Sequence, residues 1–157
     1  MKIESILEEP LIIHKIGNSK EERKRLVNEI RMLTGLPLNV LEKYPSELSG
    51  GQRQRVAIAS AMILKPDFVI CDECVSSLDV LIQAQILNLL KSMQESMNLT
   101  YLFISHNLNV VAYMADRIGV MYKGKIVEEN TTCRILKNPE HPYTKKLLLA
   151  SGLLQEQ

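Results

Sequence analysis

Two short apolar runs, each ending in polar residues, constrain the fold of this 157-residue chain most strongly. The first run, Phe68 to Cys71, ends in Asp72-Glu73, and the second, Tyr101 to Ile104, ends in Ser105-His106. Between them lies an apolar stripe of helical spacing, formed by Ile82, Ile86, Leu89, Leu90, Met93 and Met97. The order strand, helix, strand is typical of buried parallel strands. The sequence therefore predicts an α/β fold with a layered parallel sheet.

The remaining segments are predominantly helical. Pro10 is expected to break a mixed segment over residues 4–13. Helical periodicity or capping predicts helices over Lys20–Leu33, from Ser49 to about Lys65, over Leu108–Ala115 and over Pro142–Leu154. A hairpin is predicted with strands Arg117–Tyr122 and Lys125–Glu128, joined by a turn at Lys123-Gly124.

Composition excludes several classes of protein. The apolar fraction is 46%, the charged fraction 24% and the formal net charge +1, so a nucleic-acid binder that depends on a basic surface is disfavoured. No apolar run approaches the roughly 18–20 residues of a membrane span, and the first residues do not form a signal-peptide apolar region. We expect no direct membrane insertion and a cytoplasmic location.

The chain has three cysteines, and Cys71 and Cys74 form a C-x-x-C pattern. No second Cys/His pair follows at a spacing suitable for zinc. Asp72 and Glu73 stand between the two sulfurs and are expected to raise the thiol pKa, which disfavours a redox role. The pattern is therefore interpreted as structural.

A segment rich in small residues precedes the predicted helix at residue 50. In Ser49-Gly50-Gly51-Gln52 the two glycines allow close approach of a ligand to the backbone. The first-turn N–H groups of the helix suit a phosphate oxygen. Taken alone, the same residues are more typical of a capped helix that follows a loop, with Ser49 and Gln52 as a capping box.

The polar residues after the two strands form a second candidate site. A carboxylate at the end of a strand, such as Asp72, can hold Mg²⁺ against nucleotide phosphates. Glu73 can then polarise an attacking water as a general base. Because parallel strands gather ligands at their carboxyl ends, His106 is expected at the same edge, where it can hydrogen-bond a phosphoryl group.

The order and spacing of these segments resemble the ATP-binding-cassette (ABC) ATPases. Leu48 to Arg55 is similar to the signature motif of that family, and Asp72-Glu73 ends a strand similar to its Walker B strand. Ser76 to Asp79 is similar to its D-loop, and Ser105-His106 to its H-switch. The resemblance covers essentially the whole chain and implies a P-loop NTPase-like fold with a helical subdomain.

Further segments resemble the ATPases of oligopeptide and dipeptide importers. They are Glu9-Pro10-Leu11, Tyr44-Pro45, Asp79 to Gln85 and the tail from Asn138 to Lys145. Val75-Ser76 is more similar to the F-type than to the D-type subunit of such importers. Related importers carry nickel, so the resemblance implies a peptide substrate with nickel as the alternative.

The resemblance also implies ATP and Mg²⁺ as cofactors and a mechanism shared between two cassettes. Ser49, Gly50 and Gly51 grip the γ-phosphate of ATP bound by the partner cassette, and Gln52 supports that loop. Asp72 orders Mg²⁺ through water, and Glu73 is the general base. The γ-phosphate sensor is His106, while Asp79 couples the two sites. The implied partners are a second ABC ATPase subunit and transmembrane permease subunits, which place the chain at the inner face of the membrane.

The sequence departs from the family pattern in one main respect, because it contains no G-x-x-x-x-G-K-[ST] motif. The chain resembles the part of a cassette that follows the P-loop, and the N-terminal P-loop part is expected to be missing. The implied organisation is a helical subdomain (residues 1–65), a RecA-like part (66–137) and a C-terminal extension (138–157). Cys74 and Ser77 stand where the family usually has Pro and Ala.

Two functional interpretations follow from this departure. The first is an ATP-hydrolysing importer subunit, which as this chain alone is expected to hydrolyse little ATP because phosphate positioning supplies most of the catalysis. The alternative is a non-catalytic interaction or regulatory fragment that pairs with a full-length cassette or a transmembrane subunit, or a gene remnant.

Overall fold

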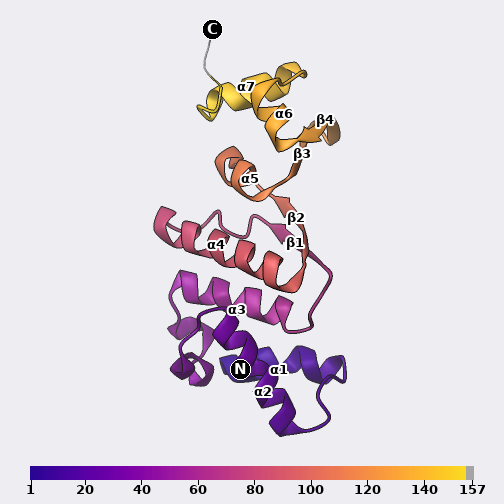
Figure 1. The fold of residues 1–157 in the computed structure, drawn as a ribbon. Helices are drawn as coiled ribbons and strands as arrows, with labels where there is room; N and C mark the ends of the chain where they lie inside the picture. Colours follow the sequence, from indigo (N-terminus) through magenta and orange to yellow (C-terminus); the bar gives the residue numbers. More distant parts are fainter. Residues whose placement is uncertain (155–157) are drawn as a thin grey trace. The chain divides into compact units, whose positions relative to one another are not determined.

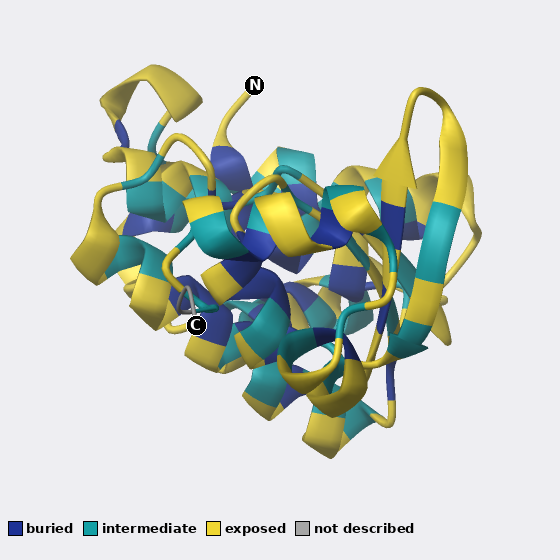
Figure 2. Cartoon of the chain, turned by 90° about the horizontal axis from the view of Figure 1, so that it is seen from above, coloured by how far each residue is buried: buried dark blue, intermediate teal, exposed yellow. Residues whose placement is uncertain are grey.

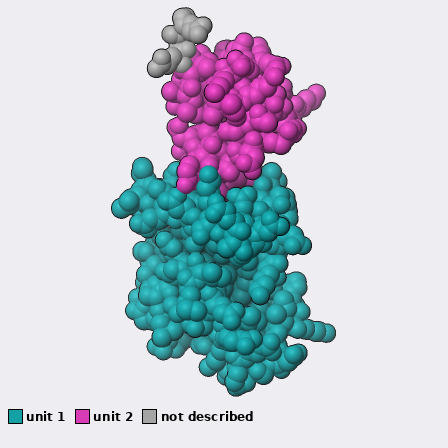
Figure 3. Space-filling model, viewed as in Figure 1, with its two compact units in different colours: residues 1–69, 77–102 teal, residues 70–76, 103–157 magenta. Residues whose placement is uncertain are grey.

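The computed structural model describes residues 1–154, with helices and strands in the order labelled in Figure 1. The chain divides into two compact units, coloured in Figure 3. The first comprises residues 1–69 and 77–102, and the second comprises residues 70–76 and those from 103 onward. Residues 155–157, the last of the expected C-terminal extension, lie outside the described part. The expected three-part organisation stays a prediction.

Helix α1 (Ile3–Ile13) replaces the broken segment expected from Pro10. Ile3, Leu7 and Leu11 recur every four residues on one face, and all three are fully buried. A proline inside a helix costs about 3 kcal/mol, whereas burying three large aliphatic side chains contributes roughly 5–9 kcal/mol. The expectation of a break was wrong because the burial of this face outweighs the cost of Pro10.

Helices α2 (Lys20–Leu33) and α3 (Gly50–Met62) confirm two predicted helices. In α2 the buried positions are Val27 and Ile30, while Leu33 is exposed. Helix α3 ends at Met62, before Lys65, whose φ of 51° is left-handed. Two short 3₁₀ helices, η1 (Leu38–Glu42) and η2 (Pro45–Glu47), connect α2 to α3.

Strands β1 (Phe68–Asp72) and β2 (Thr100–Ile104) form a two-stranded sheet. Thr100 N donates to Asp67 O at 3.0 Å before β1, and Glu73 N donates to Ile104 O at 3.0 Å after it. Residues near 67 and 100 thus pair at one end and residues near 73 and 104 at the other, so the strands are parallel. Helix α4 (Val80–Met97) connects them and buries Ile86, Leu87, Leu90 and Met93.

The expectation that both strands are buried was wrong. Phe68, Ile70, Leu102 and Ile104 are exposed, by 53%, 60%, 47% and 44%. Successive side chains of a strand point to opposite faces, and these four residues occupy alternate positions of their strands. In β1 only Cys71 is buried. Figure 2 colours the chain by the burial of each residue. The apolar residues of these strands therefore lie on both faces of the sheet, one face exposed and the other covered.

The hairpin predicted in the second unit is confirmed. Strand β3 (Arg117–Tyr122) pairs antiparallel with β4 (Lys125–Thr131), which continues three residues beyond the expected end. Lys123 and Gly124 have φ values of 48° and 76°, as a two-residue hairpin turn requires. A buried apolar cluster includes two residues of this hairpin, Ile118 and Val120. The cluster is completed by Val111 and Ile135.

Three helices complete the second unit: α5 (Leu108–Met114), α6 (Thr132–Lys137) and α7 (Pro142–Ala150). The sequence did not predict α6, a single short helix, and α7 ends four residues earlier than expected. The carboxylate of Glu128 on β4 accepts hydrogen bonds from the backbone N–H groups of Glu140 and His141, each at 2.9 Å. A negative charge thus lies at the N-terminus of α7, where the helix dipole favours it.

Candidate functional site

Glu73 lies directly after β1, at a sharp change in backbone direction. Its φ of 48° is left-handed, which is unusual for a residue with a Cβ. The carbonyl oxygen of Glu73 accepts hydrogen bonds from Ser76 N at 3.2 Å and Ser76 Oγ at 2.9 Å. Together with the bond from Glu73 N to Ile104 O, these contacts hold the backbone of Glu73 at both its N–H and its C=O.

The structure brings the side chains of Glu73 and His106 together, 33 residues apart in sequence. Oε1 of Glu73 lies 2.8 Å from Nδ1 of His106 and accepts from His106 N at 3.1 Å. The His106 side chain is 78% exposed and that of Glu73 39% exposed. The hydrogen bond from the His106 ring holds the pKa of Glu73 below its ordinary value, so Glu73 is ionised at neutral pH.

The second carboxylate oxygen of Glu73, Oε2, is buried and has no hydrogen-bond partner among the described residues. A buried oxygen without a donor fits a water molecule held next to a general base. The preceding residue, Asp72, has an exposed side chain at the end of β1. No group of three or more His, Cys, Asp or Glu residues in the described part could enclose a metal ion. Mg²⁺ often takes one or two protein carboxylates, with water and phosphate oxygens as its other ligands, so Asp72 fits that cation.

The signature-like residues lie at the start of α3, in the first unit. Ser49 Oγ accepts from Gln52 N at 3.3 Å, and Gln52 Oε1 accepts from Ser49 N at 3.2 Å. This is the capping box that the sequence predicted. Because Ser49 Oγ accepts this bond, its own hydroxyl hydrogen is still available for a phosphate oxygen.

The two glycines of this segment differ in a way that the sequence did not predict. A Cβ on Gly51 would lie 2.7 Å from Cγ2 of Ile82 in α4, whereas a Cβ on Gly50 would meet Leu78 Cδ2 at an ordinary 3.7 Å. Gly51 therefore allows α3 and α4 to pack closely. No local sequence pattern signals this role, because it depends on the contact between two helices.

Asp79 is exposed and precedes α4 in the same unit. Its Oδ1 atom accepts a hydrogen bond from Ile82 N at 3.0 Å, so Asp79 is the N-cap of α4. The structure thus places Ser49, Gly50, Gly51, Gln52 and Asp79 at the N-termini of two helices in the first unit. Three further residues lie in the second unit: Asp72 is the last residue of β1, Glu73 follows it, and His106 follows β2.

The cysteines of the C-x-x-C pattern interact with each other. Cys71 is buried and Cys74 is partly buried. The neighbouring Cys74 side chain raises the pKa of Cys71, and the neighbouring Cys71 side chain lowers the pKa of Cys74. The sequence indicated a raised pKa from the adjacent acids, and for Cys74 the neighbouring thiol outweighs that effect.

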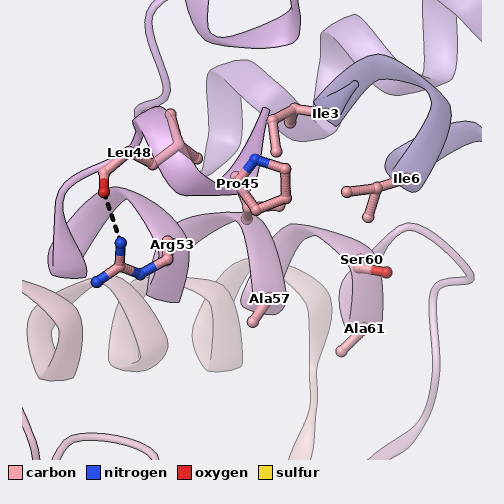
Figure 4. A pocket seen from close by; sticks show the side chains of 9 residues that line it. Ile3, Ile6, Pro45, Leu48, Arg53, Ala57, Ser60 and Ala61 are labelled. Atoms are coloured by element: carbon pink, nitrogen blue, oxygen red, sulfur yellow. Dashed lines mark hydrogen bonds between the residues drawn. The ribbon is translucent and has the colours of Figure 1, made fainter. Parts of the chain in front are cut away.

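An apolar pocket of about 530 Å³ lies in the first unit (Figure 4). It is lined by Ile3, Ile6, Pro45, Leu48, Arg53, Val56, Ala57, Ser60 and Ala61. One wall is held by Arg53, which donates to Leu48 O at 2.8 Å. The lining contains no carboxylate or imidazole, so the pocket offers no acid–base group.

No helix in the described part is long and apolar enough to cross a membrane.

Comparisons with known proteins agree with the sequence and the fold. The ABC transporter family model matches residues 2–76. The chain is 50% identical over 153 residues to the oligopeptide transport ATP-binding protein OppF of Bacillus subtilis, covering 98% of this chain and 50% of the relative. It is 49% identical over 153 residues to the dipeptide transport ATP-binding protein DppF of Haemophilus influenzae, covering 98% and 46%. The chain therefore spans about half the length of the curated relatives it matches.

Solved structures extend this likeness to the fold. The dimeric bacterial ABC transporter cassette MJ0796 superposes with a TM-score of 0.73 at 31% identity, over 84% of this chain and 57% of that one. A second structure of that cassette, a post-hydrolysis state with ADP and Pi, matches equally well. By both measures, this chain is similar to ABC transporter ATP-binding proteins, and in sequence to those of oligopeptide and dipeptide transport.

Proposed function

We propose that this chain is the signature- and Walker B-bearing part of the ATP-binding subunit of an ABC importer for oligopeptides or dipeptides. The observation that carries the proposal is the contact between Glu73 and His106 after two adjacent parallel strands. It supports a phosphoryl-transfer site because it joins an ionised carboxylate to an exposed imidazole. The similarity to oligopeptide and dipeptide transport proteins supports the peptide class over nickel.

In this proposal Glu73 is the general base. Oε1 is engaged by His106, which orients the carboxylate and leaves Oε2 free to accept a hydrogen bond from a water. The lowered pKa keeps Glu73 ionised at neutral pH. His106 is largely exposed, so its ring can also contact a transferring phosphoryl group as a γ-phosphate sensor.

The remaining residues hold nucleotide and cation. Asp72 would order Mg²⁺ through water, which neutralises charge on the phosphates of ATP. Gly50, Gly51 and the hydroxyl of Ser49 would contact a γ-phosphate at the N-terminus of α3. Gln52 holds the backbone of Ser49 through its side-chain amide. Asp79, at the start of α4, would couple this site to the second one.

The proposed partners are a second ABC ATPase subunit, which supplies a P-loop in trans, and permease subunits in the membrane. The dimeric form of the similar cassette MJ0796 supports a second ATPase subunit as a partner. Because no P-loop motif occurs in these residues, the chain alone is expected to hydrolyse ATP at a negligible rate.

The test is a complementation assay with a P-loop-bearing cassette whose own signature motif has been disabled. Adding this chain is expected to restore phosphate release, and Gly50→Asp is expected to abolish the restored activity. Gly50 is the better position for the substitution because its Cβ has room, so the added charge acts on phosphate without disturbing the fold.

Cys133→Ser is the matched control, since Cys133 is exposed and outside the site. Restoration that persists in Gly50→Asp contradicts the assigned role of this segment. Co-purification of the chain with the cassette without any restored turnover contradicts the enzymatic proposal and favours the interaction fragment.

A further inference from the structure

The apolar pocket of the first unit is a groove with a charged group at one end. Arg53 and Leu48 lie at that end of the row of lining residues, and Ser60 and Ala61 lie at the other (Figure 4). The volume of about 530 Å³ falls within the roughly 300–1,000 Å³ that is usual for small-molecule sites. The groove therefore has the size of a binding site for a small molecule with one polar end.

The floor of the groove is formed by helix α3. Arg53, Ala57 and Ala61 are four residues apart, so they follow one another along one face of the helix, and all three are exposed. The opposite wall is apolar and includes Ile3 of α1 and Pro45. From Arg53 to Ala61 the helix rises by about 12 Å, at roughly 1.5 Å per residue. An extended hydrocarbon chain of about ten carbons has that length, because each C–C bond adds roughly 1.25 Å.

The guanidinium group of Arg53 is the one charged group among the described residues that line the groove. Its Nη1 atom donates to Leu48 O at 2.8 Å, which uses one of the five N–H donors that a guanidinium group has. In the described part of the chain no carboxylate pairs with Arg53. Glu47, next to Leu48 in sequence, instead accepts a hydrogen bond from Tyr44 N at 2.6 Å. A cation with unused donors at one end of an apolar groove is complementary to a single carboxylate.

We propose that this groove binds a free medium-chain carboxylate, with its head group on Arg53 and its hydrocarbon chain along Ala57 toward Ala61. Burial of the chain against the apolar walls drives binding. Charge-assisted hydrogen bonds to Arg53 select a carboxylate over an uncharged head group. This inference goes beyond the proposed function and does not depend on it, because none of the residues assigned to nucleotide or cation lines the groove.

The first experiment titrates decanoate, below its micelle concentration, into the full chain and follows the backbone amide signals by NMR. We expect saturable shifts at Ala57, Ser60 and Ala61, and an affinity for decanoate at least about tenfold higher than for decanol. Decyltrimethylammonium, which has the same tail and the opposite charge, is expected not to bind. The absence of a saturable shift with decanoate overturns the proposal, and so does equal affinity for decanoate and decanol.

Two variants separate the carboxylate contact from the groove itself. Arg53→Gln keeps a donor for Leu48 O and removes the charge, so the affinity for decanoate is expected to fall at least about tenfold, to that of decanol. Ala57→Leu places a larger side chain on the floor and is expected to weaken the binding of both ligands. Arg25→Gln is the control for the loss of charge, because Arg25 is an exposed residue of α2 outside the lining.

Circular dichroism checks that each variant folds. Unchanged decanoate affinity in folded Arg53→Gln overturns the placement of the carboxylate. If Arg53→Gln does not fold, Ala57→Leu decides the question, because Ala57 is exposed and its replacement leaves the core intact. Decanoate affinity that is unchanged in Ala57→Leu then overturns the proposed site.

A last set of measurements tests for other occupants of the groove. In sedimentation velocity, a dimer that Ala57→Leu dissociates and decanoate does not would place a second copy of the chain on the groove and overturn the proposal. The chain is also mixed with vesicles of phosphatidylcholine and phosphatidylglycerol. Co-sedimentation that Ala57→Leu abolishes and decanoate does not displace would assign the groove to a membrane surface, and this result also overturns the free carboxylate. Displacement by decanoate in either measurement supports it.

Discussion

Gly51 in α3 faces Ile82 in α4 so closely that a Cβ on the glycine would lie 2.7 Å from Cγ2 of the isoleucine. The neighbouring Gly50 has no such restriction. One glycine of the signature-like segment is therefore required by packing, irrespective of any ligand. The sequence pattern alone does not distinguish a glycine that helix packing requires from a glycine that leaves room for a ligand.

Replacing Gly51 with alanine is expected to destabilise the chain by about 1–3 kcal/mol, the usual cost of overpacking. The β-branched Ile82 side chain has little freedom to move away. Urea unfolding measures the change, with Gly50→Ala as the control that stays within about 0.5 kcal/mol of the parent. If packing is the cause, Ile82→Ala in the Gly51→Ala background recovers part of the loss. A double variant whose loss is the sum of the single losses would argue against this contact.

The contact between Glu73 and His106 predicts a pH dependence. The folded-state pKa of Glu73 is lowered by the His106 ring. Its contribution to stability is therefore present above the unfolded-state pKa and is lost as pH falls through the folded-state pKa. In His106→Ala we expect the pKa of Glu73 to rise toward its ordinary value, as measured by NMR titration of its carboxyl carbon. His14→Ala, at the end of α1, is the control. An unchanged Glu73 titration in His106→Ala would exclude the contact in solution.

A second carboxylate, Glu128, is predicted to hold the C-terminal helix. Burial raises the pKa of Glu128, but the backbone N–H of Glu140, the Thr144 side chain and the backbone N–H of His141 together outweigh this and hold the pKa below its ordinary value. Glu128→Gln removes the charge at the N-terminus of α7 and is expected to cost about 1 kcal/mol. Amide hydrogen exchange at residues 140 and 141 is expected to accelerate.

The matched control is Glu129→Gln, because Glu129 is adjacent and more exposed, and pairs with Arg117 across the hairpin. The difference between the two variants should disappear when the pH falls below the folded-state pKa of Glu128, since Glu128 is then neutral in the Glu129→Gln variant as well. Equal exchange rates in the two variants at neutral pH would rule out the anchoring role.

The sequence by itself determined most helices and strands and their order, because these depend on neighbours along the chain, but it did not predict α1 as one helix or α6 at all. The local signals were the helical spacing of Leu26, Ile30 and Leu33, the capping box of Ser49 and Gln52, and the turn at Lys123-Gly124. The same holds for the placement of Glu73 and His106, since Glu73 directly follows one apolar strand and His106 lies two residues after the other. The prediction that they share an edge needed only the general geometry of parallel strands.

The tertiary structure alone decided which contacts these residues make. Pro10 lies within a helix because Ile3, Leu7 and Leu11 are buried, and their burial depends on segments far along the chain. The close approach of Gly51 to Ile82 and the open apolar face of β1 likewise depend on packing partners. The bond that orients Glu73 toward His106 depends on a left-handed backbone that no residue type at that position announces. Local chemistry selects the elements, whereas burial and close contact between distant segments select the side-chain geometry on which the site depends.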